Sequence, residues 1–141
     1  MKAIILFLIP MYAYSANITI EKPCSQETIE FSVSPQNSSL GQIMIEILDY
    51  NRIEYQGNTQ GINSLLGTAV GLESYEVLSD ERMRVYGWCY SVNGQNIEKL
   101  MSNYFPTKSD NIRWFYAYAE IIKNDWISYC TPVSLDLPVC H

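Results

Sequence analysis

Most of the chain alternates between apolar and polar residues, and this pattern predicts β-strands. The alternation is strictest over residues 28–33, where Ile29, Phe31 and Val33 would face a core. Residues 43–48 alternate less cleanly, and we expect them to return beside the first segment as the second strand of a hairpin. The same pattern predicts further strands over residues 16–20, 74–78, 83–92, 112–122 and 126–129.

One segment, residues 62–71, has the spacing of a helix. Ile62, Leu65, Leu66 and Ala69 stand at positions i, i+3, i+4 and i+7, so they would form one apolar stripe. Strands with a single short helix predict an α+β domain, in which the helix packs on one face of a mixed sheet.

Turns and loops separate these elements. Asn93 and Gly94 accept the positive φ angles of a tight hairpin turn. Residues 97–105 fit either a helical turn or a loop. The tail over residues 132–141 holds two prolines, and we expect it to lie extended along the surface, held by Cys140.

The first fifteen residues have the pattern of a secretory signal peptide. Lys2 supplies a positive charge, residues 3–11 are almost wholly apolar, and residues 13–15 (Ala-Tyr-Ser) place small side chains before a cleavage site. We therefore expect a single mature domain of residues 16–141, secreted or periplasmic, with no membrane insertion after cleavage. A buried N-terminal strand is the alternative.

Composition and charge fit one exported domain. The chain has 141 residues, 48% of them hydrophobic and 17% charged, which is enough to bury a core. Its net charge of −6 comes without a basic cluster, and this argues against nucleic acid as a partner. An even number of cysteines in an exported chain predicts disulfides, with three possible pairings. The cysteines are Cys24, Cys89, Cys130 and Cys140.

The sequence offers little for catalysis, and we expect no enzyme, no catalytic residue and no metal site. Its one histidine, His141, is the last residue and has no neighbour to orient it. Cys89 has no evident base and is expected in a disulfide. Asp80, Glu81 and Asp110 fall in polar turns and are expected to be solvated. None of the common nucleophile, zinc-protease or phosphate-loop motifs occurs.

The aromatic residues carry the remaining functional signal. In the strand over residues 83–92, Tyr86, Trp88, Tyr90 and Val92 share one face. In the strand over residues 112–122, one face carries large aromatic side chains and the other carries Phe115, Ala117, Ala119 and Ile121.

A single helix can cover only one face of the sheet. Small side chains would let it approach closely, so we expect it on the face of Ala117 and Ala119. The aromatic face would then be a partly open platform for a flat or apolar ligand. The alternative is that the large aromatics form the core. The candidate binding residues are Trp88, Tyr90, Trp114, Tyr116, Tyr118 and Trp126.

Three blocks of sequence carry a family resemblance. Residues 87–94 read G-W-C-Y-S-V-N-G, residues 112–119 read I-R-W-F-Y-A-Y-A, and Trp126 precedes C-T-P at residues 130–132. In this combination the chain resembles a bacterial branch of the transcobalamin C-terminal-like domain family, whose function is uncharacterised. That family resembles the β-grasp, ubiquitin-like fold, and the match extends over residues 28–132.

The resemblance implies a non-enzymatic binding or surface module. It also implies that Cys89 pairs with Cys130, which would leave Cys24 with Cys140 and tie the two ends of the domain together. In transcobalamin-like proteins this domain closes over cobalamin beside a large helical domain. We expect no such helical partner in this chain, and we assign no cofactor.

Two functions follow as hypotheses. The first is an exported module that binds a small ligand or a protein partner through its aromatic strands. The second is a structural or interaction subunit of a cell-envelope assembly, in which a sheet edge or the tail docks the partner.

Overall fold

The structure is a computed structural model that describes residues 15–141. The signal peptide expected at residues 1–15 therefore lies outside the described residues, apart from Ser15. The elements of the described part are β1 (Ala16–Glu21), β2 (Thr28–Val33), α1 (Leu40–Asn51), β3 (Tyr55–Asn58), β4 (Gly61–Leu65), β5 (Tyr75–Ser79), β6 (Arg82–Val92), β7 (Gln95–Asn96), β8 (Asn111–Ile122) and β9 (Asp125–Pro132), with short 3-10 helices at Gly71–Ser74, Met101–Asn103 and Pro138–Cys140.

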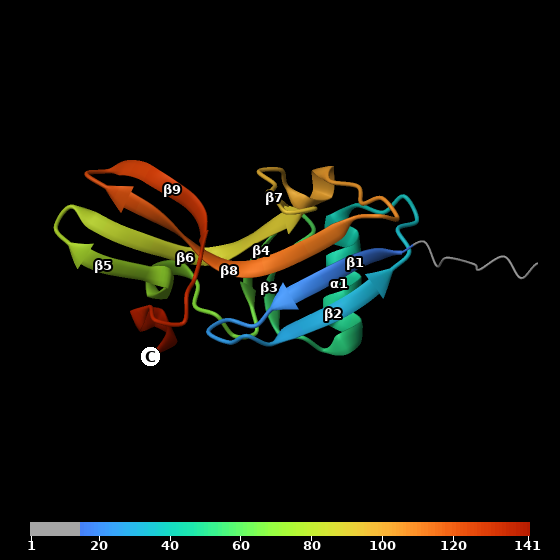
Figure 1. Ribbon diagram of the computed structural model, residues 1–141, viewed down its shortest axis with the longest axis horizontal. Helices are drawn as coiled ribbons and strands as arrows, with labels where there is room; N and C mark the ends of the chain where they lie inside the picture. The colour runs from blue at the N-terminus through green and yellow to red at the C-terminus, as the bar shows by residue number, and fades with distance from the viewer. Residues whose placement is uncertain (1–14) are drawn as a thin grey trace, which may run out of the picture.

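One mixed sheet organises the molecule, as Figure 1 shows. Its seven strands follow the order β2-β1-β8-β6-β5, with β7 added beside β6 and β9 added beside β8. β1 and β8 are parallel, and the other paired strands are antiparallel. Strands β3 and β4 form a separate hairpin. The prediction of an α+β domain with a mixed sheet and a single α-helix is confirmed for the described residues.

The long pair β6–β8 runs through two halves of this sheet, which differ in the strands that flank the pair. The two strands pair without interruption from Arg82 opposite Ile122 to Val92 opposite Ile112. Along its other edge, β8 pairs first with β1 and then, from Ala117 onward, with β9. We call the end with β1, β2 and α1 the helix half, and the end with β5 and β9 the open half (Figure 1).

The helix lies where the sequence pattern predicted a strand. The expectation of a strand over residues 43–48 is wrong, because these residues belong to α1. Ser39 caps the helix in a capping box with Gln42, and each accepts a backbone hydrogen bond from the other. The apolar positions repeat at helical spacing once the window begins at the cap. The buried residues of α1 are Leu40, Gly41, Ile43, Met44, Ile47 and Leu48.

The helix predicted over residues 62–71 is also wrong. Residues Gly61–Leu65 form strand β4, which turns back along β3. Ile62 and Leu65 do reach the core, but Leu66 and Gly67 follow with φ angles of 56° and 76°. Two successive residues with positive φ cannot continue a right-handed helix. The apolar spacing therefore reflects a strand followed by a turn.

The main core lies between α1 and the aromatic face of the sheet. Tyr90, Val92, Ile112 and Trp114 pack in one cluster with the apolar residues of α1. The expectation that the helix covers the face of Ala117 is therefore wrong. The large side chains fill the layer between helix and sheet, as close packing of a protein interior requires.

The predicted turns and cross-links have clear positions in the structure. Asn93 and Gly94 have φ angles of 51° and 83° and join β6 to β7 in a two-residue turn, as predicted. One disulfide joins Cys89 to Cys130 and the other joins Cys24 to Cys140. These are the pairs that the family resemblance implies, and the second ties the tail to the β1–β2 turn. Over residues 15–141, no helix is long and apolar enough to cross a bilayer.

Candidate functional site

The six aromatic residues proposed as a binding platform do not share one open surface. Tyr90, Trp114 and Tyr116 are only 6%, 2% and 7% exposed, so the expectation of an open face is wrong for them. They belong to the interior, which was the alternative reading. Trp88 is half-buried, and its indole Nε1 donates to Thr68 Oγ1 at 2.9 Å.

The remaining two candidates lie in the open half of the sheet. Tyr118 is half-buried, and the Arg84 guanidinium stands 4.8 Å from the centre of its ring. Trp126 is 50% exposed and is the second residue of the return strand β9. Trp126 pairs with Ile121 of β8 and so shares its face. This face of the sheet carries the small residues and lies opposite the face that α1 covers.

The small-residue face forms a low floor in the open half. Val85 and Gly87 of β6 lie opposite Ala119 and Ala117 of β8, respectively. None of these side chains rises far above the backbone. The sequence pattern identifies this set of small residues, but the expectation that they contact the helix is wrong. In the structure the floor is overlaid by β9 instead.

β9 bends over this floor, and the distance between the Cα atoms of the Cys89–Cys130 disulfide measures the bend. Cys89 lies on β6 and Cys130 on β9, and β8 runs between these two strands. In a flat sheet, two strands that flank a third lie about 9.5 Å apart. The two cysteine Cα atoms are only 5.8 Å apart. The β8–β9 register shifts near Glu120, and Cys130 has a φ of 52°, which accommodates the bend.

The bend creates a groove with an aromatic wall. Trp126 and Tyr129 of β9 stack with ring centres 5.7 Å apart and planes inclined by 18°. They are 50% and 62% exposed, although large aromatic side chains usually bury most of their surface. The groove between this wall and the small-residue floor has a volume of about 250 Å³. We call it the aromatic groove, and its lining residues include Val85, Gly87, Cys89, Ala117, Ala119, Trp126, Tyr129 and Cys130.

Tyr129 is the member of this site that sequence analysis missed. A usable signal was present, because Trp126 and Tyr129 are both aromatic and lie in a short return strand after a turn. Their shared exposure depends on the bend of β9, and strand alternation does not predict a bend.

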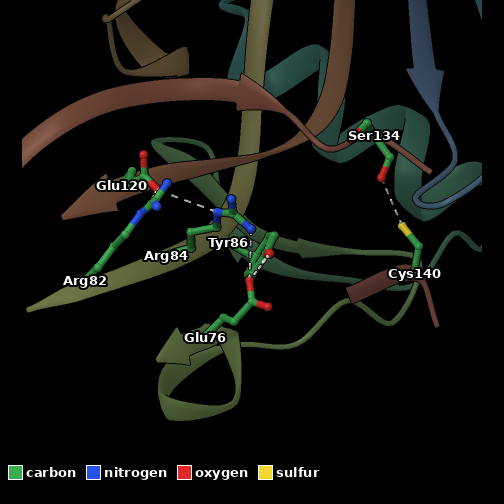
Figure 2. Close-up of polar contacts among 7 residues, drawn as sticks. All are labelled: Glu76, Arg82, Arg84, Tyr86, Glu120, Ser134 and Cys140. Atoms are coloured by element: carbon green, nitrogen blue, oxygen red, sulfur yellow. Dashed lines mark hydrogen bonds and ion pairs between the residues drawn. The ribbon is translucent and has the colours of Figure 1, made fainter. Parts of the chain in front are cut away.

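An ion-pair network fixes the opposite face of the same strands. Figure 2 shows Arg84 between the carboxylates of Glu76 on β5 and Glu120 on β8. Arg82 forms a further ion pair with Glu120 at 2.6 Å. The Tyr86 hydroxyl donates to Glu76, and its burial together with this hydrogen bond raises the pKa of Tyr86 to about 12. The network joins β5, β6 and β8 and so holds the strands that carry the floor.

The three carboxylates that were expected in polar turns differ in how far they are exposed to solvent. Asp80 and Glu81 are exposed, as expected. The expectation that Asp110 is solvated is wrong, because it is only 6% exposed. Its carboxylate accepts hydrogen bonds from Asn93 Nδ2 at 2.9 Å, from the Tyr104 hydroxyl at 2.9 Å and from the Thr107 backbone N–H at 2.8 Å.

These contacts make Asp110 a structural group. Burial opposes its ionisation, but the hydrogen bonds outweigh burial and lower the pKa of Asp110. Both of its carboxylate oxygens already accept hydrogen bonds from neighbouring loops. Across residues 15–141, no three histidine, cysteine, aspartate or glutamate side chains cluster in a way that could hold a metal ion.

The fold and the site define a class: a disulfide-linked α+β domain with an exposed aromatic wall above an apolar groove. No family model and no curated protein matches the chain. One matching solved structure is the crystal structure of a "putative metal binding protein" from Ruminococcus gnavus ATCC 29149. That protein is 13% identical to this chain, and the match covers 72% of this chain and 94% of that chain with a TM-score of 0.48. At this level of similarity we transfer no function.

Proposed function

We propose that the protein is an exported, non-enzymatic binding module that holds an apolar ring in the aromatic groove. The observation that carries the proposal is the exposed stack of Trp126 and Tyr129, fastened above small residues by a disulfide. Exposed aromatic pairs lose hydration favourably when a flat apolar group covers them. A groove held by a covalent link also needs little ordering on binding, which favours affinity.

The size of the groove indicates the class of ligand. Pockets for drug-sized molecules usually measure about 300–1,000 Å³. The aromatic groove, at about 250 Å³, suits one ring, such as a small aromatic molecule or an aromatic side chain on a partner protein. Its floor offers no charged side chain. Selectivity would therefore come from shape and apolar contact.

We further propose that the domain has a β-grasp fold of the transcobalamin C-terminal-like class. The support is the sheet order, in which the first strand β1 lies parallel to and beside the late strand β8. The β1–β2 hairpin leads directly into α1, which packs on this sheet. The paired cysteines agree with the resemblance, and two disulfides fit an oxidising compartment outside the cytosol.

Calorimetric titration of the oxidised domain with indole and with p-cresol tests the ring-binding proposal. We expect saturable binding of both, and about tenfold weaker binding, or about 1.4 kcal/mol, for Trp126→Ala and Tyr129→Ala. Tyr50→Ala is the matched control, because Tyr50 is 88% exposed on α1, away from the groove. The proposal fails if neither probe binds, or if the Tyr50 variant loses as much affinity as the Trp126 variant.

A further inference from the structure

The outer edge of the helix half presents a second surface, separate from the aromatic groove. Within residues 15–141, β2 is the end strand of the sheet and pairs with β1 alone (Figure 1). Alternate residues of β2 therefore direct their backbone N–H and C=O groups away from the sheet. A strand edge of this kind can accept an extended segment of another chain through main-chain hydrogen bonds.

The space beside this edge is hollowed on the helix side. A groove of about 840 Å³ lies between the end of β2, the loop that follows it and one flank of α1. Figure 1 shows α1 passing behind the end of β2. Val33, Ile43 and Ile47 supply apolar lining, and Tyr50 stands 88% exposed among the lining residues. Side chains of an added strand alternate between two faces, so those that face the helix beside the end of β2 would enter this groove.

The charge of the groove indicates the chemistry of the occupant. Glu46 and Asp49 line it, and no lysine or arginine does. Glu30 adds a negative charge on the opposite face of β2, and α1 contains no basic residue. A second copy of this chain would bring the same negative charges to the contact and be repelled. A basic segment would be attracted to it.

We infer that the β2 edge and the adjoining α1 groove bind an extended basic peptide segment of a partner protein by strand addition. Backbone groups of the segment pair with the free edge of β2. Its alternate lysines or arginines enter the groove, where their aliphatic stems lie beside Val33 and Ile47 and their charged ends reach Glu46 and Asp49. This interaction surface is independent of ring binding at Trp126 and Tyr129.

Fluorescence anisotropy with a short labelled peptide of alternating valine and lysine tests the inference. We expect saturable binding to the oxidised domain, with backbone amide NMR shifts concentrated in β2 and α1. Glu46→Lys should weaken binding about tenfold. Glu73→Lys is the matched control, since it makes the same charge change at an exposed position outside the groove. A valine–glutamate peptide, or a valine–lysine peptide methylated on alternate backbone nitrogens, should not bind.

Several results would overturn the inference. One is absence of valine–lysine peptide binding at millimolar concentration, and another is equal weakening by Glu46→Lys and Glu73→Lys. Amide shifts confined to β8 and β9 would place the peptide in the aromatic groove instead. Self-association through β2 without peptide would identify a second copy as the occupant. Trp126→Ala should leave peptide affinity unchanged, so failure of this inference and failure of ring binding can be told apart.

Discussion

At the scale of single residues, Asp110 shows how a buried charge can hold a loop without taking part in chemistry. Its carboxylate connects the β6–β7 turn, through Asn93, with the loop before β8, through Tyr104 and Thr107. Its backbone carbonyl also accepts from the Asn17 N–H of β1. One side chain and its peptide group thus join three segments at the end of the helix half.

Replacing this carboxylate should be costly. We expect Asp110→Asn to lower the free energy of unfolding by about 2 kcal/mol at pH 7, because hydrogen bonds to a charged group contribute about 1.5–3 kcal/mol. Urea denaturation measures the change. Asp80→Asn, in an exposed turn, should change stability by less than about 0.5 kcal/mol. Equal effects of the two variants would contradict a structural role for Asp110.

The same residue predicts a pH dependence. The pKa of Asp110 is lower in the folded protein than the ordinary value of about 3.9. Its contribution to stability is therefore complete above about pH 5 and is lost as the pH falls through the folded pKa. Between pH 5 and pH 2, the wild type should lose more stability than Asp110→Asn does. Parallel acid profiles for the two proteins would show that the carboxylate does not carry this dependence.

At the scale of elements, α1 and the β3–β4 hairpin depend on one close contact. Gly41 lies in the first turn of α1, and a Cβ atom added there would stand 1.9 Å from the carbonyl oxygen of Thr59. Thr59 lies in the turn between β3 and β4. Glycine weakens an isolated helix by about 1 kcal/mol relative to alanine, so its presence here reflects packing.

At position 41, glycine should give the more stable protein, although alanine is usually preferred in a helix. We expect Gly41→Ala to destabilise the domain by about 3 kcal/mol or more, because the added methyl group meets backbone atoms that cannot turn aside. Gly61→Ala is the control, since a Cβ there meets nothing within 4 Å. Thermal unfolding of the two variants measures the difference. A neutral Gly41→Ala would mean that the helix and the hairpin do not touch as described.

The two elements that the sequence pattern misassigned explain the limits of prediction from sequence. Over residues 43–48, six residues satisfied both a loose alternation and a helical repeat, and only the cap at Ser39 with Gln42 distinguishes them. Over residues 62–71, helical spacing was met by chance, and the positive φ of Leu66 decides for a turn. In contrast, β2, β6 and β8 were predictable because their alternation is long or strict. The Asn93–Gly94 turn was predictable because its residues favour positive φ.

The candidate site was predictable only in part, for a related reason. Trp126 was identified from its aromatic character, but Tyr129 becomes important only through the bend in β9. The helix was expected on the face of the small residues, but α1 packs on the aromatic face. Tyr90 and Trp114 of the expected platform therefore lie in the core.

At the scale of the whole molecule, two disulfides have different roles. Cys24–Cys140 closes a separation of 116 residues and ties the tail to the first hairpin. Cys89–Cys130 closes a separation of 41 residues and fastens β9 over the floor of the aromatic groove. From loop closure alone, their removal should cost about 5 and about 4 kcal/mol, respectively.

Stability and ring binding should therefore respond differently to the two pairs. We expect Cys24→Ser with Cys140→Ser to lower the unfolding temperature while the folded protein still binds indole. We expect Cys89→Ser with Cys130→Ser to lower it as well and also to abolish indole binding, because β9 is released. Calorimetric titration well below the unfolding temperature separates the two effects. Loss of indole binding in the folded Cys24/Cys140 variant alone would contradict this assignment.

The most direct test of ring binding in the aromatic groove is an NMR titration of alanine methyl groups with indole. Ala117 and Ala119 lie in the floor of the groove, whereas Ala16 is buried in β1 at the other end of the sheet. A ring seated between the floor and the Trp126–Tyr129 wall should move the Ala119 methyl signal upfield in a saturable way, with a smaller shift for Ala117. The Ala16 signal should stay fixed. Saturable indole binding that leaves the Ala117 and Ala119 signals in place would contradict ring binding in the aromatic groove.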